Sequence, residues 1–292
     1  YTRARASGRA RSYATYATYE LMARGLPKRK PLIGVEHIFI VASGKGGVGK
    51  STTAVNLSTS LKILEPEKSI GLLDADVFGP SIPLMMNVSQ TPVVNKEKLM
   101  EPVVNYGIKC MSMGLVTDNN DNSSVIWRGP MVMSAINTLL YQVAWQPLDY
   151  LIIDTPPGTG DTHLSIIQNL PISGVLLVTT PQRAALEVTR KGASMFKKLN
   201  IPIIGILENM SSVTCSKCAN EIALFGGGTR EIARELGIAF LIELSVYITK
   251  NGDAGKPIVL AAPHSAEAKV YKRLAEDLIL FLNKNSSKRE LH

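Results

Sequence analysis

Short apolar runs alternate with longer segments of helical periodicity along the chain. The runs are stretches of Val, Ile and Leu without polar alternation, which indicates strands buried on both faces of a parallel sheet. The predicted strands cover residues 38–43, 70–74, 108–113, 125–127, 150–154, 174–179, 203–208 and 240–244. The predicted helices cover residues 50–64, 131–143, 162–168, 185–199, 229–236 and 266–282. This alternation predicts a single doubly wound α/β domain with a mostly parallel sheet.

Two polar stretches, residues 87–101 and 116–124, interrupt the alternation and are expected to be loops of the same domain. We expect a leader over residues 1–30, one folded domain over residues 31–284 and a polar tail over residues 285–292. No apolar run approaches the roughly 18 residues that a spanning helix needs, so we expect no transmembrane segment.

The net charge of +8 over 292 residues is distributed unevenly. Eight of the 32 Lys and Arg residues and one of the 24 Asp and Glu residues lie in residues 1–30, which leaves 24 basic and 23 acidic residues beyond Lys30. A nearly neutral domain argues against nucleic acid as its partner.

Residues 1–19 contain no Asp or Glu and are rich in Arg, Ser, Ala and Tyr. This composition is typical of an organellar transit peptide, and we expect import into the mitochondrion, with the matrix as destination. A basic arm that touches RNA or acidic lipid is the alternative interpretation.

A phosphate-binding motif, GxxxxGK[ST], lies between the first predicted strand and the first predicted helix. This phosphate loop consists of Gly44, Lys45, Gly46, Gly47, Val48, Gly49, Lys50, Ser51 and Thr52. Its glycines let the backbone approach phosphates, whose charge the amides and the helix N-terminus attract. We expect Lys50 to reach the β- and γ-phosphates of ATP and Ser51 to bind Mg²⁺.

Lys45 is a second cation in the phosphate loop. A lysine directed at the phosphates of its own chain would be repelled by Lys50, whereas one directed across a dimer would stabilise charge on the partner's nucleotide. An exposed lysine without a catalytic role is the other interpretation.

Aspartates follow two further strands, at the edge where open α/β sheets bind ligands. We expect Asp74 to hold a magnesium-bound water and Asp76 to orient or activate the attacking water. Asp154 ends its strand as a Walker B aspartate does, and the Gly- and Pro-rich segment 155–161 is able to move with the γ-phosphate. Helix N-capping is the alternative for each aspartate.

Two of the three cysteines, Cys215 and Cys218, form a CxxC motif. One such pair supplies two thiolates, while a zinc ion or a cubane cluster needs about four ligands, so two chains related by a twofold axis would complete the set. A redox-active pair and half of a zinc site are alternatives. Cys110 lies within an apolar strand and is expected to be a buried small hydrophobe.

Together these motifs resemble those of the deviant-Walker-A ATPases, the group that includes the MinD and ParA partitioning proteins, arsenite-pump ATPases and the nitrogenase iron protein. The resemblance rests on GKGGVGKST, DADVFGPS and IDTPPGTGD. It narrows to the Mrp-type iron–sulfur carriers through WRGP, PPGTGD, ENMS and the CxxC motif, and it covers about residues 24–282. The basic leader, RGLPK and CMSMG are most similar to the mitochondrial branch of that family, which is associated with iron–sulfur cluster delivery during assembly of respiratory complex I.

The resemblance implies an ATP-sandwich homodimer in which Lys45 acts across the interface, with slow ATP hydrolysis. It also implies a labile [4Fe–4S] cluster between the Cys215 and Cys218 pairs of two chains, for delivery to apo iron–sulfur proteins, with complex I subunits as the expected recipients. Asn209 would pair with adenine; a turn-forming asparagine is the alternative.

Four positions depart from the pattern of the family. Arg183 stands where relatives usually carry Asp, Val188 where an acidic residue is common, and Leu244 and Ser245 where Pro-Leu is expected. These changes concern contacts with the nucleotide base and the coupling of the switch, whereas the phosphate and cysteine motifs are intact.

Two other classes of function stay open. A partitioning-type ATPase would act on a membrane or DNA surface, because residues 266–282 predict an amphipathic helix suited to peripheral contact with lipid. Packing of this helix on the sheet is the competing interpretation, since Glu267, Glu276 and Asp277 dilute any basic face. A zinc-stabilised ATPase chaperone would hold zinc at the cysteines.

Overall fold

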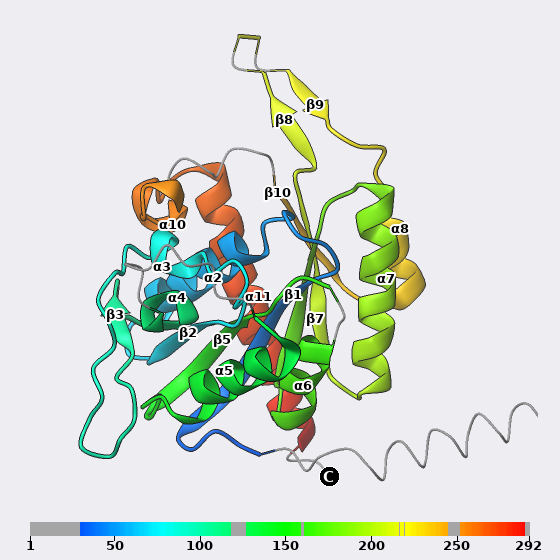
Figure 1. Ribbon diagram of the computed structural model, residues 1–292. Coiled ribbons are helices and arrows are strands. Elements are labelled where there is room, and N and C mark those ends of the chain that lie inside the picture. The colour runs from blue at the N-terminus through cyan, green and yellow to red at the C-terminus, as the bar shows by residue number, and fades with distance from the viewer. Residues whose placement is uncertain are drawn as a thin grey trace, which may run out of the picture.

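The computed structural model describes residues 30–117, 127–158, 161–215, 217–218, 220–244 and 252–289. Within these residues, the central sheet has eight strands in the order β10-β7-β6-β1-β5-β2-β4-β3 (Figure 1). Neighbouring strands are parallel except for β3 and β4. The bounds are β1 (Val35–Ser43), β2 (Ile70–Asp74), β3 (Val103–Asn105), β4 (Ile108–Ser112), β5 (Leu148–Asp154), β6 (Gly174–Thr179), β7 (Ile203–Asn209) and β10 (Phe240–Leu244).

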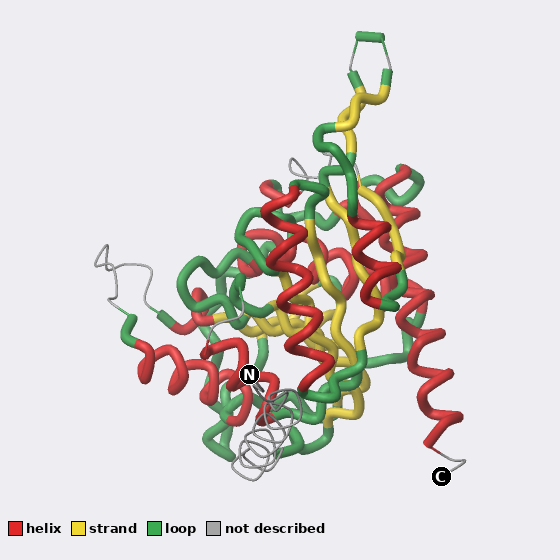
Figure 2. The backbone as a smooth tube through the Cα atoms, turned by 90° about the vertical axis from the view of Figure 1, so that its right-hand side faces the viewer, coloured by secondary structure: helices red, strands yellow, loops and turns green. Residues whose placement is uncertain are grey.

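Helices cover both faces of this sheet, and α11 runs along one side of the molecule (Figure 2). One face packs against α2 (Lys50–Leu64), α3 (Ile82–Met85), α10 (Ile258–Ala261) and α11 (Ala266–Arg289). The other face packs against α5 (Gly129–Tyr141), α6 (Asp161–Asn169), α7 (Arg183–Lys198) and α8 (Thr229–Leu236). A short helix, α4 (Met113–Val116), follows β4, and a separate hairpin consists of β8 (Ser212–Thr214) and β9 (Glu221–Ala223).

The central strand β1 shows how the sequence produces these layers. Phe39 and Val41 lie in the apolar cluster that contains α2 and α11, whereas Ile38 and Ile40 lie in the cluster that contains α5 and α7. All four side chains are buried. Because successive strand residues face opposite sides, a strand between two helical layers needs apolar residues at every position. The predicted fold class is therefore confirmed.

Local contacts move the ends of several predicted elements. The helix expected at residues 131–143 begins two residues earlier, since Pro130 suits its first turn. It ends at Tyr141 because the backbone that follows turns to Met100, whose amide donates to the carbonyl of Gln142 at 2.8 Å.

The strand expected at residues 108–113 ends at Ser112, whose hydroxyl accepts from the Gly114 amide at 3.1 Å and caps α4. The strand expected at residues 125–127 falls mainly outside the described residues, and Trp127 belongs to no strand.

The last helix, α11, is longer than expected and continues to Arg289, through the start of the predicted polar tail. No Pro or Gly follows Leu282 to end it. Leu274 and Leu278 are each 1% exposed and lie in the cluster that contains α2, so the packing interpretation of this helix is confirmed. In the described part of the chain, no helix is both long enough and apolar enough to cross a membrane.

Gly205 in β7 provides a test of the packing. A Cβ atom here would lie 2.4 Å from Cγ of Leu241 and 2.8 Å from the carbonyl oxygen of Ala239. We expect Gly205→Ala to lower the free energy of unfolding by about 1–3 kcal/mol, because the backbone oxygen has no room to move aside. Gly226→Ala is the control, since a Cβ there meets nothing within 4 Å. Urea denaturation measures both, and equal midpoints would contradict this packing.

Candidate functional site

The phosphate loop joins β1 to α2 at the carboxyl edge of the sheet. Gly47 and Gly49 have φ values of +77° and +87°, which a residue with a side chain adopts only with strain. A Cβ at Gly47 would meet nothing within 4 Å, so the backbone here is open to a bound group. The loop is also fixed to the end of β1, because the Ser43 hydroxyl donates to the Lys45 carbonyl at 3.0 Å.

Lys50 forms a buried ion pair with Asp154, and its Nζ lies 2.6 Å from Oδ1 of the carboxylate. The two side chains are 7% and 0% exposed. Parallel pairing of β1 with β5 places Asp154 beside Val41, close to the start of the phosphate loop. Lys50 Nζ also donates to the Ser51 hydroxyl at 3.3 Å. The expected Walker A lysine and Walker B aspartate are thus brought together.

The second oxygen of Asp154, Oδ2, is buried and has no hydrogen-bond partner among the described residues. Burial raises the pKa of Asp154, and the positive charge of Lys50 opposes this rise. A buried carboxylate oxygen without a partner requires a cation or a water molecule. Together with the hydroxyl of Ser51 it forms the hard oxygen donor set that Mg²⁺ prefers, so the residues present fit the ion.

Asp74 ends β2 and organises the loop that follows it. Its Oδ2 accepts from the amides of Ser81 and Ile82 at 3.0 and 3.2 Å and from the Ser112 hydroxyl at 3.2 Å. Burial, followed by the charge of Asp154, raises the pKa of Asp74 to about 7. These amides belong to the first residues of α3 and to the residue before it. Asp74 therefore caps the N-terminus of α3, as the alternative interpretation of this aspartate expected.

Asp76 is half-buried beside the same cluster. Its amide donates to Oδ1 of Asp74 at 3.1 Å, and its negative charge contributes to the raised pKa of Asp154. The carboxylate of Asp76 is therefore close enough to Asp154 for its charge to act on that residue. A residue that orients water at the γ-phosphate needs such a position.

The segment after Asp154, here called the switch loop (residues 155–160), is described as far as Gly158. The Thr155 hydroxyl donates to the Val41 carbonyl at 3.0 Å, and the Gly158 amide donates to the Ser43 carbonyl at 2.8 Å. These bonds fasten the loop to β1 directly beneath the phosphate loop.

His163 is a further residue of this region, and no motif indicated it. Its side chain is 2% exposed, and Nδ1 lies 3.4 Å from the carbonyl oxygen of Pro156 in the switch loop. Burial lowers the pKa of His163 to about 4, so the imidazole is neutral near pH 7 and able to donate to this carbonyl.

Lys45 is exposed, unlike the buried Lys50. Its Nζ donates to Oε1 of Gln182, the residue before α7, at 3.1 Å. The two lysines of the phosphate loop therefore occupy different places, one in the core and one on the surface.

Asn209, the last residue of β7, contacts the phosphate loop. Its Nδ2 donates to the Val48 carbonyl at 2.9 Å, and its Oδ1 accepts from the Met210 amide at 2.9 Å. A Cβ at Gly49 would lie 2.2 Å from Nδ2, so Gly49 is also required by this contact. The adenine contact of Asn209 stays a prediction.

The departures from the family pattern lie around α7 and β10. A Cβ at Gly44 would lie 2.7 Å from the side chain of Val188, which therefore packs directly on the start of the phosphate loop. Arg183 is exposed at the start of α7. Leu244 is buried, and its carbonyl accepts from the Ser211 hydroxyl at 3.1 Å, while Ser245 lies outside the described residues.

Cys215 and Cys218 lie in the turn of a hairpin that stands out from the body of the molecule (Figure 1). This cysteine hairpin comprises β8, β9 and the described residues between them, which are Cys215, Lys217, Cys218 and Asn220. Cys218 is exposed and Cys215 partly so, and both are free thiols. Backbone amides of Lys217 and Cys218 lower the pKa of Cys215, which favours the thiolate that binds metal.

Among the described residues, His, Cys, Asp and Glu form no group of three or more that could hold a metal ion. Two thiols per chain thus provide half of a tetrahedral donor set. Cys110 is 0% exposed and burial raises the pKa of its thiol to about 12, so its expected place as a buried hydrophobe is confirmed.

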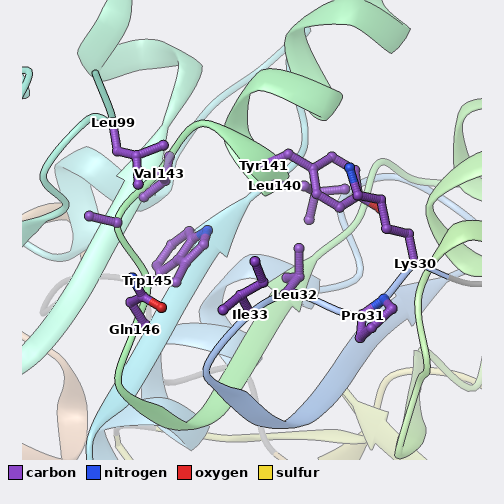
Figure 3. Close-up of a pocket in the computed structure, with 11 residues that line it drawn as sticks. Lys30, Pro31, Leu32, Ile33, Leu99, Leu140, Tyr141, Val143, Trp145 and Gln146 are labelled. Carbon is purple, nitrogen blue, oxygen red and sulfur yellow. The ribbon is translucent and has the colours of Figure 1, made fainter. Parts of the chain in front are cut away.

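A separate cavity of about 230 Å³ lies at the opposite, amino-terminal edge of the sheet (Figure 3). Its walls come from residues 30–33, 140–141 and 143–146 together with Leu99. Lys30 lies over the ring of Tyr141, 4.7 Å from its centroid. The lining contains no carboxylate, thiol or imidazole, so this cavity has no part in the chemistry of the phosphate loop.

The sequence motifs did not indicate three residues that contact the site, namely Ser112 at Asp74, Gln182 at Lys45 and His163 at Pro156. Ser112 and Gln182 reach the site from elements that are distant in sequence. His163 follows the PPGTGD motif closely in the sequence, but its burial beside the switch loop is seen only in the structure.

Comparison with known proteins gives a consistent result. Residues 34–279 match the model of a ParA-type family described as NUBPL iron-transfer P-loop NTPase. The iron-sulfur cluster transfer protein NUBPL of Mus musculus is 49% identical over 263 residues, which are 89% of this chain and 82% of the mouse protein. An Arabidopsis thaliana protein, named iron-sulfur protein required for NADH dehydrogenase, mitochondrial, is 46% identical and covers 91% of this chain and 85% of its own length.

Solved structures agree with the fold. A nucleotide-binding protein from Archaeoglobus fulgidus, in complex with ADP, is 35% identical with a TM-score of 0.65 and covers 77% of this chain and 88% of that chain. The cell division ATPase MinD of Pyrococcus furiosus, at 22% identity and a TM-score of 0.59 over 83% of this chain and 98% of its own, has the same fold.

The buried ion pair predicts different stabilities for substitutions of the two lysines. We expect Lys50→Ala to lower the free energy of unfolding by about 3–5 kcal/mol without nucleotide, because Asp154 is left buried and unpaired. Lys45→Ala removes an exposed contact and should change the same quantity by at most about 0.5 kcal/mol. Urea denaturation without nucleotide tests both, and similar midpoints for the two variants would refute the difference.

Proposed function

The chain belongs to the NUBPL iron-transfer P-loop NTPase family, as its motifs predicted, and we propose that it is an ATP-dependent iron–sulfur cluster carrier. It binds a labile cluster and delivers it to apo iron–sulfur proteins, with subunits of respiratory complex I as recipients. The name of the Arabidopsis relative supports this recipient class and a mitochondrial location. We propose the matrix as the compartment.

One observation carries the proposal: a single strand end connects the nucleotide loop to the thiols. Asn209 holds the Val48 carbonyl of the phosphate loop, and the cysteine hairpin begins at Ser212, three residues later. A displacement of the phosphate loop is therefore passed through one short segment to Cys215. Coupling of this kind is what a carrier that binds and releases a cluster with nucleotide requires.

The phosphate loop binds ATP, with Lys50 at the β- and γ-phosphates and the loop amides around them. Ser51 and the unpartnered oxygen of Asp154 would hold Mg²⁺, and Asp74 would hold a water bound to the ion. When bound, Mg²⁺ neutralises charge on the phosphates. Asp76 orients the water that attacks the γ-phosphate. Hydrolysis is slow, and each round of hydrolysis changes the geometry of the chain for one transfer of a cluster.

Lys45 completes the site of a second copy. Its exposed position and its contact with Gln182 support a role across a homodimer, where a cation stabilises charge on the transferring phosphoryl group. In this arrangement Gln182 holds Lys45 until a partner nucleotide takes its place.

The cargo is a [4Fe–4S] cluster shared between two chains. Cys215 and Cys218 of each chain supply two thiolates, so a twofold pair supplies the four that such a cluster uses. The exposed position of the hairpin turn suits a cluster that has to be released.

Substitution of the cysteines tests the cargo. After anaerobic reconstitution with iron and sulfide, we expect about two iron atoms per wild-type chain and a particle of twice the chain mass. Cys215→Ser and Cys218→Ser should each lose the cluster, because a shared site then has two thiolates instead of four. Iron and sulfide analysis with Mössbauer spectroscopy measures the loss.

Cys110→Ala is the matched control for this experiment, because its thiol is buried in the core and should not affect iron content. Cluster content that is indifferent to Cys215 and Cys218 would contradict the proposal. About half a zinc ion per chain, with no iron after anaerobic purification, would replace it with a structural zinc site.

Substitution of Lys45 tests its action across the dimer. We expect Lys45→Ala to bind ATP with nearly wild-type affinity but to hydrolyse it about 10²-fold more slowly or worse, since one charge-stabilising group is lost. Asp76→Ala should be equally slow. Mixing the two inactive variants should restore hydrolysis, because one site in the mixed dimer has its own Asp76 and the partner's intact lysine. Absence of any restoration would mean that Lys45 acts within its own chain.

A further inference from the structure

His163 is a polar residue buried between two helices that cover the same face of the sheet. It belongs to α6, its side chain is 2% exposed, and the ring of Phe196 from α7 packs against the imidazole with the two centroids 5.6 Å apart. The edge-on arrangement of the rings, at 62°, fixes the plane of the imidazole. Burial lowers the pKa of His163 to about 4, and the charge of Lys50 acts in the same direction, so the ring is neutral near pH 7.

The contact with Pro156 determines which nitrogen of the ring carries the proton. A carbonyl oxygen only accepts hydrogen bonds, so Nδ1 of the neutral imidazole, 3.4 Å from the oxygen, is the donor. Nε2 is then an acceptor, and in the described part of the chain this buried atom has no partner. An apolar side chain would avoid the cost of a buried acceptor without a partner. The donor at Nδ1 is therefore what a histidine provides at this position and an apolar residue does not.

The switch loop depends on this donor at its centre. Pro156 is buried, and among the residues that the structure describes, His163 is the one hydrogen-bond donor to its carbonyl. Pro156 and Pro157 have no amide hydrogen, so this pair cannot be held through donors of its own backbone. Thr155 and Gly158, on either side of the pair, are bonded to β1. His163 thus fixes the segment between these two bonds, from the helical layer.

The segment that His163 holds lies against the phosphate loop. A Cβ at Gly46 would lie 4.0 Å from Cγ of Pro157, which is an ordinary van der Waals distance. Asp154, whose unpartnered oxygen fits Mg²⁺, comes two residues before Pro156. Because each proline has a fixed φ, a displacement of the Pro156 carbonyl carries the ring of Pro157 with it. The position of the imidazole therefore affects the wall of the phosphate loop.

We propose that His163 is a positioning residue for ATP hydrolysis: its imidazole holds the Pro156 carbonyl and so fixes the switch loop against the phosphate loop. The inference rests on the proposed function, in which ATP is hydrolysed beside this loop. The distance of 3.4 Å exceeds the usual range of about 2.7–3.2 Å for an N–H···O bond, so the loop has room to move toward the imidazole. Small displacements of groups around a reacting phosphate have large effects on rate, about 10²-fold for 1 Å.

The first measurement is the NMR spectrum of the imidazole nitrogens of the ¹⁵N-labelled chain, without nucleotide. Near pH 7 we expect His163 to be neutral with its proton on Nδ1. The chain has four histidines, and the spectrum of His163→Asn assigns the signals, because those of His163 are then missing. A proton on Nε2 would overturn the proposal, since Nδ1 could not donate to the Pro156 carbonyl.

The second measurement compares kcat and KM for ATP among variants. His163→Leu removes the donor and keeps apolar bulk, so we expect kcat to fall about tenfold while KM stays within about twofold. His163→Asn keeps an N–H donor close to the place of Nδ1 and should recover most of kcat. Ile167→Ala is the matched control, since Ile167 is 1% exposed in the same helix and its loss should lower stability but not kcat. Equal kcat for His163→Leu and the wild type would overturn the proposal.

Hydrogen exchange of the Gly158 amide separates this inference from the proposed function. The amide is bonded to the Ser43 carbonyl at 2.8 Å, and we expect it to exchange about tenfold faster in His163→Leu than in the wild type, without nucleotide. Equal exchange in both would overturn the proposal. If the wild type hydrolyses no ATP, the proposed hydrolysis fails, and exchange and tautomer still decide whether His163 holds the switch loop. Thermal unfolding checks folding, and His163→Gln replaces a His163→Leu that does not fold, since its amide reaches the place of Nε2 instead of Nδ1.

Discussion

The buried pair of Lys50 and Asp154 is the interaction on which the arrangement of the site depends. Removing two charges from water costs several kcal/mol for each, and the cost is recovered only if the geometry of the pair is good. The 2.6 Å contact requires β1 and β5 to be neighbours and the phosphate loop to fold back over the sheet. It also couples ligand to protein: a phosphate that attracts Lys50 leaves Asp154 in need of another positive partner, in addition to the one that its unpartnered Oδ2 requires.

Local signals made most of the fold predictable from the sequence. Strands buried on both faces are unbroken apolar runs, and the phosphate loop needs glycines at fixed spacing, so both can be recognised without knowledge of distant residues. The cysteine hairpin was not predicted, because strands of three residues have too few positions to establish an alternation. Ser112 contacts Asp74 from a strand 38 residues further along the chain, and no local pattern indicates this contact. His163 contacts Pro156 only seven residues before it, but its burial there depends on the packing of the fold. Asp74 was predicted to hold a magnesium-bound water, and its Oδ2 also accepts from two backbone amides. The sequence did not indicate these bonds, because the two donors lie seven and eight residues further along the chain.

The nucleotide site and the two cysteines of the CxxC motif lie in different parts of the molecule. The nucleotide site is built into the core, where low exposure strengthens each charge, whereas the thiols stand on a ribbon outside it. Burial would protect a permanent metal site, but it would also prevent release of a cargo. The contact of Asn209 with Val48 is one connection between the two regions. A nearly neutral surface beyond Lys30 adds no strong field of its own, so local contacts decide which partners are accepted.

Helix α7 gives the fold a mechanical property. Val188 packs on Gly44, and Gln182 holds Lys45, so the first turns of the helix rest on the phosphate loop. Between these contacts, Leu186 lies against Gly228, at the point where the chain returns from the cysteine hairpin. An α-helix of 16 residues behaves as a stiff rod about 24 Å long. Because a rigid helix moves as one body, a tilt of α7 that moves Val188 away from Gly44 also displaces Leu186 from Gly228, where the chain leaves the cysteine hairpin. In the same way, a displacement of the hairpin is transmitted through α7 to the phosphate loop.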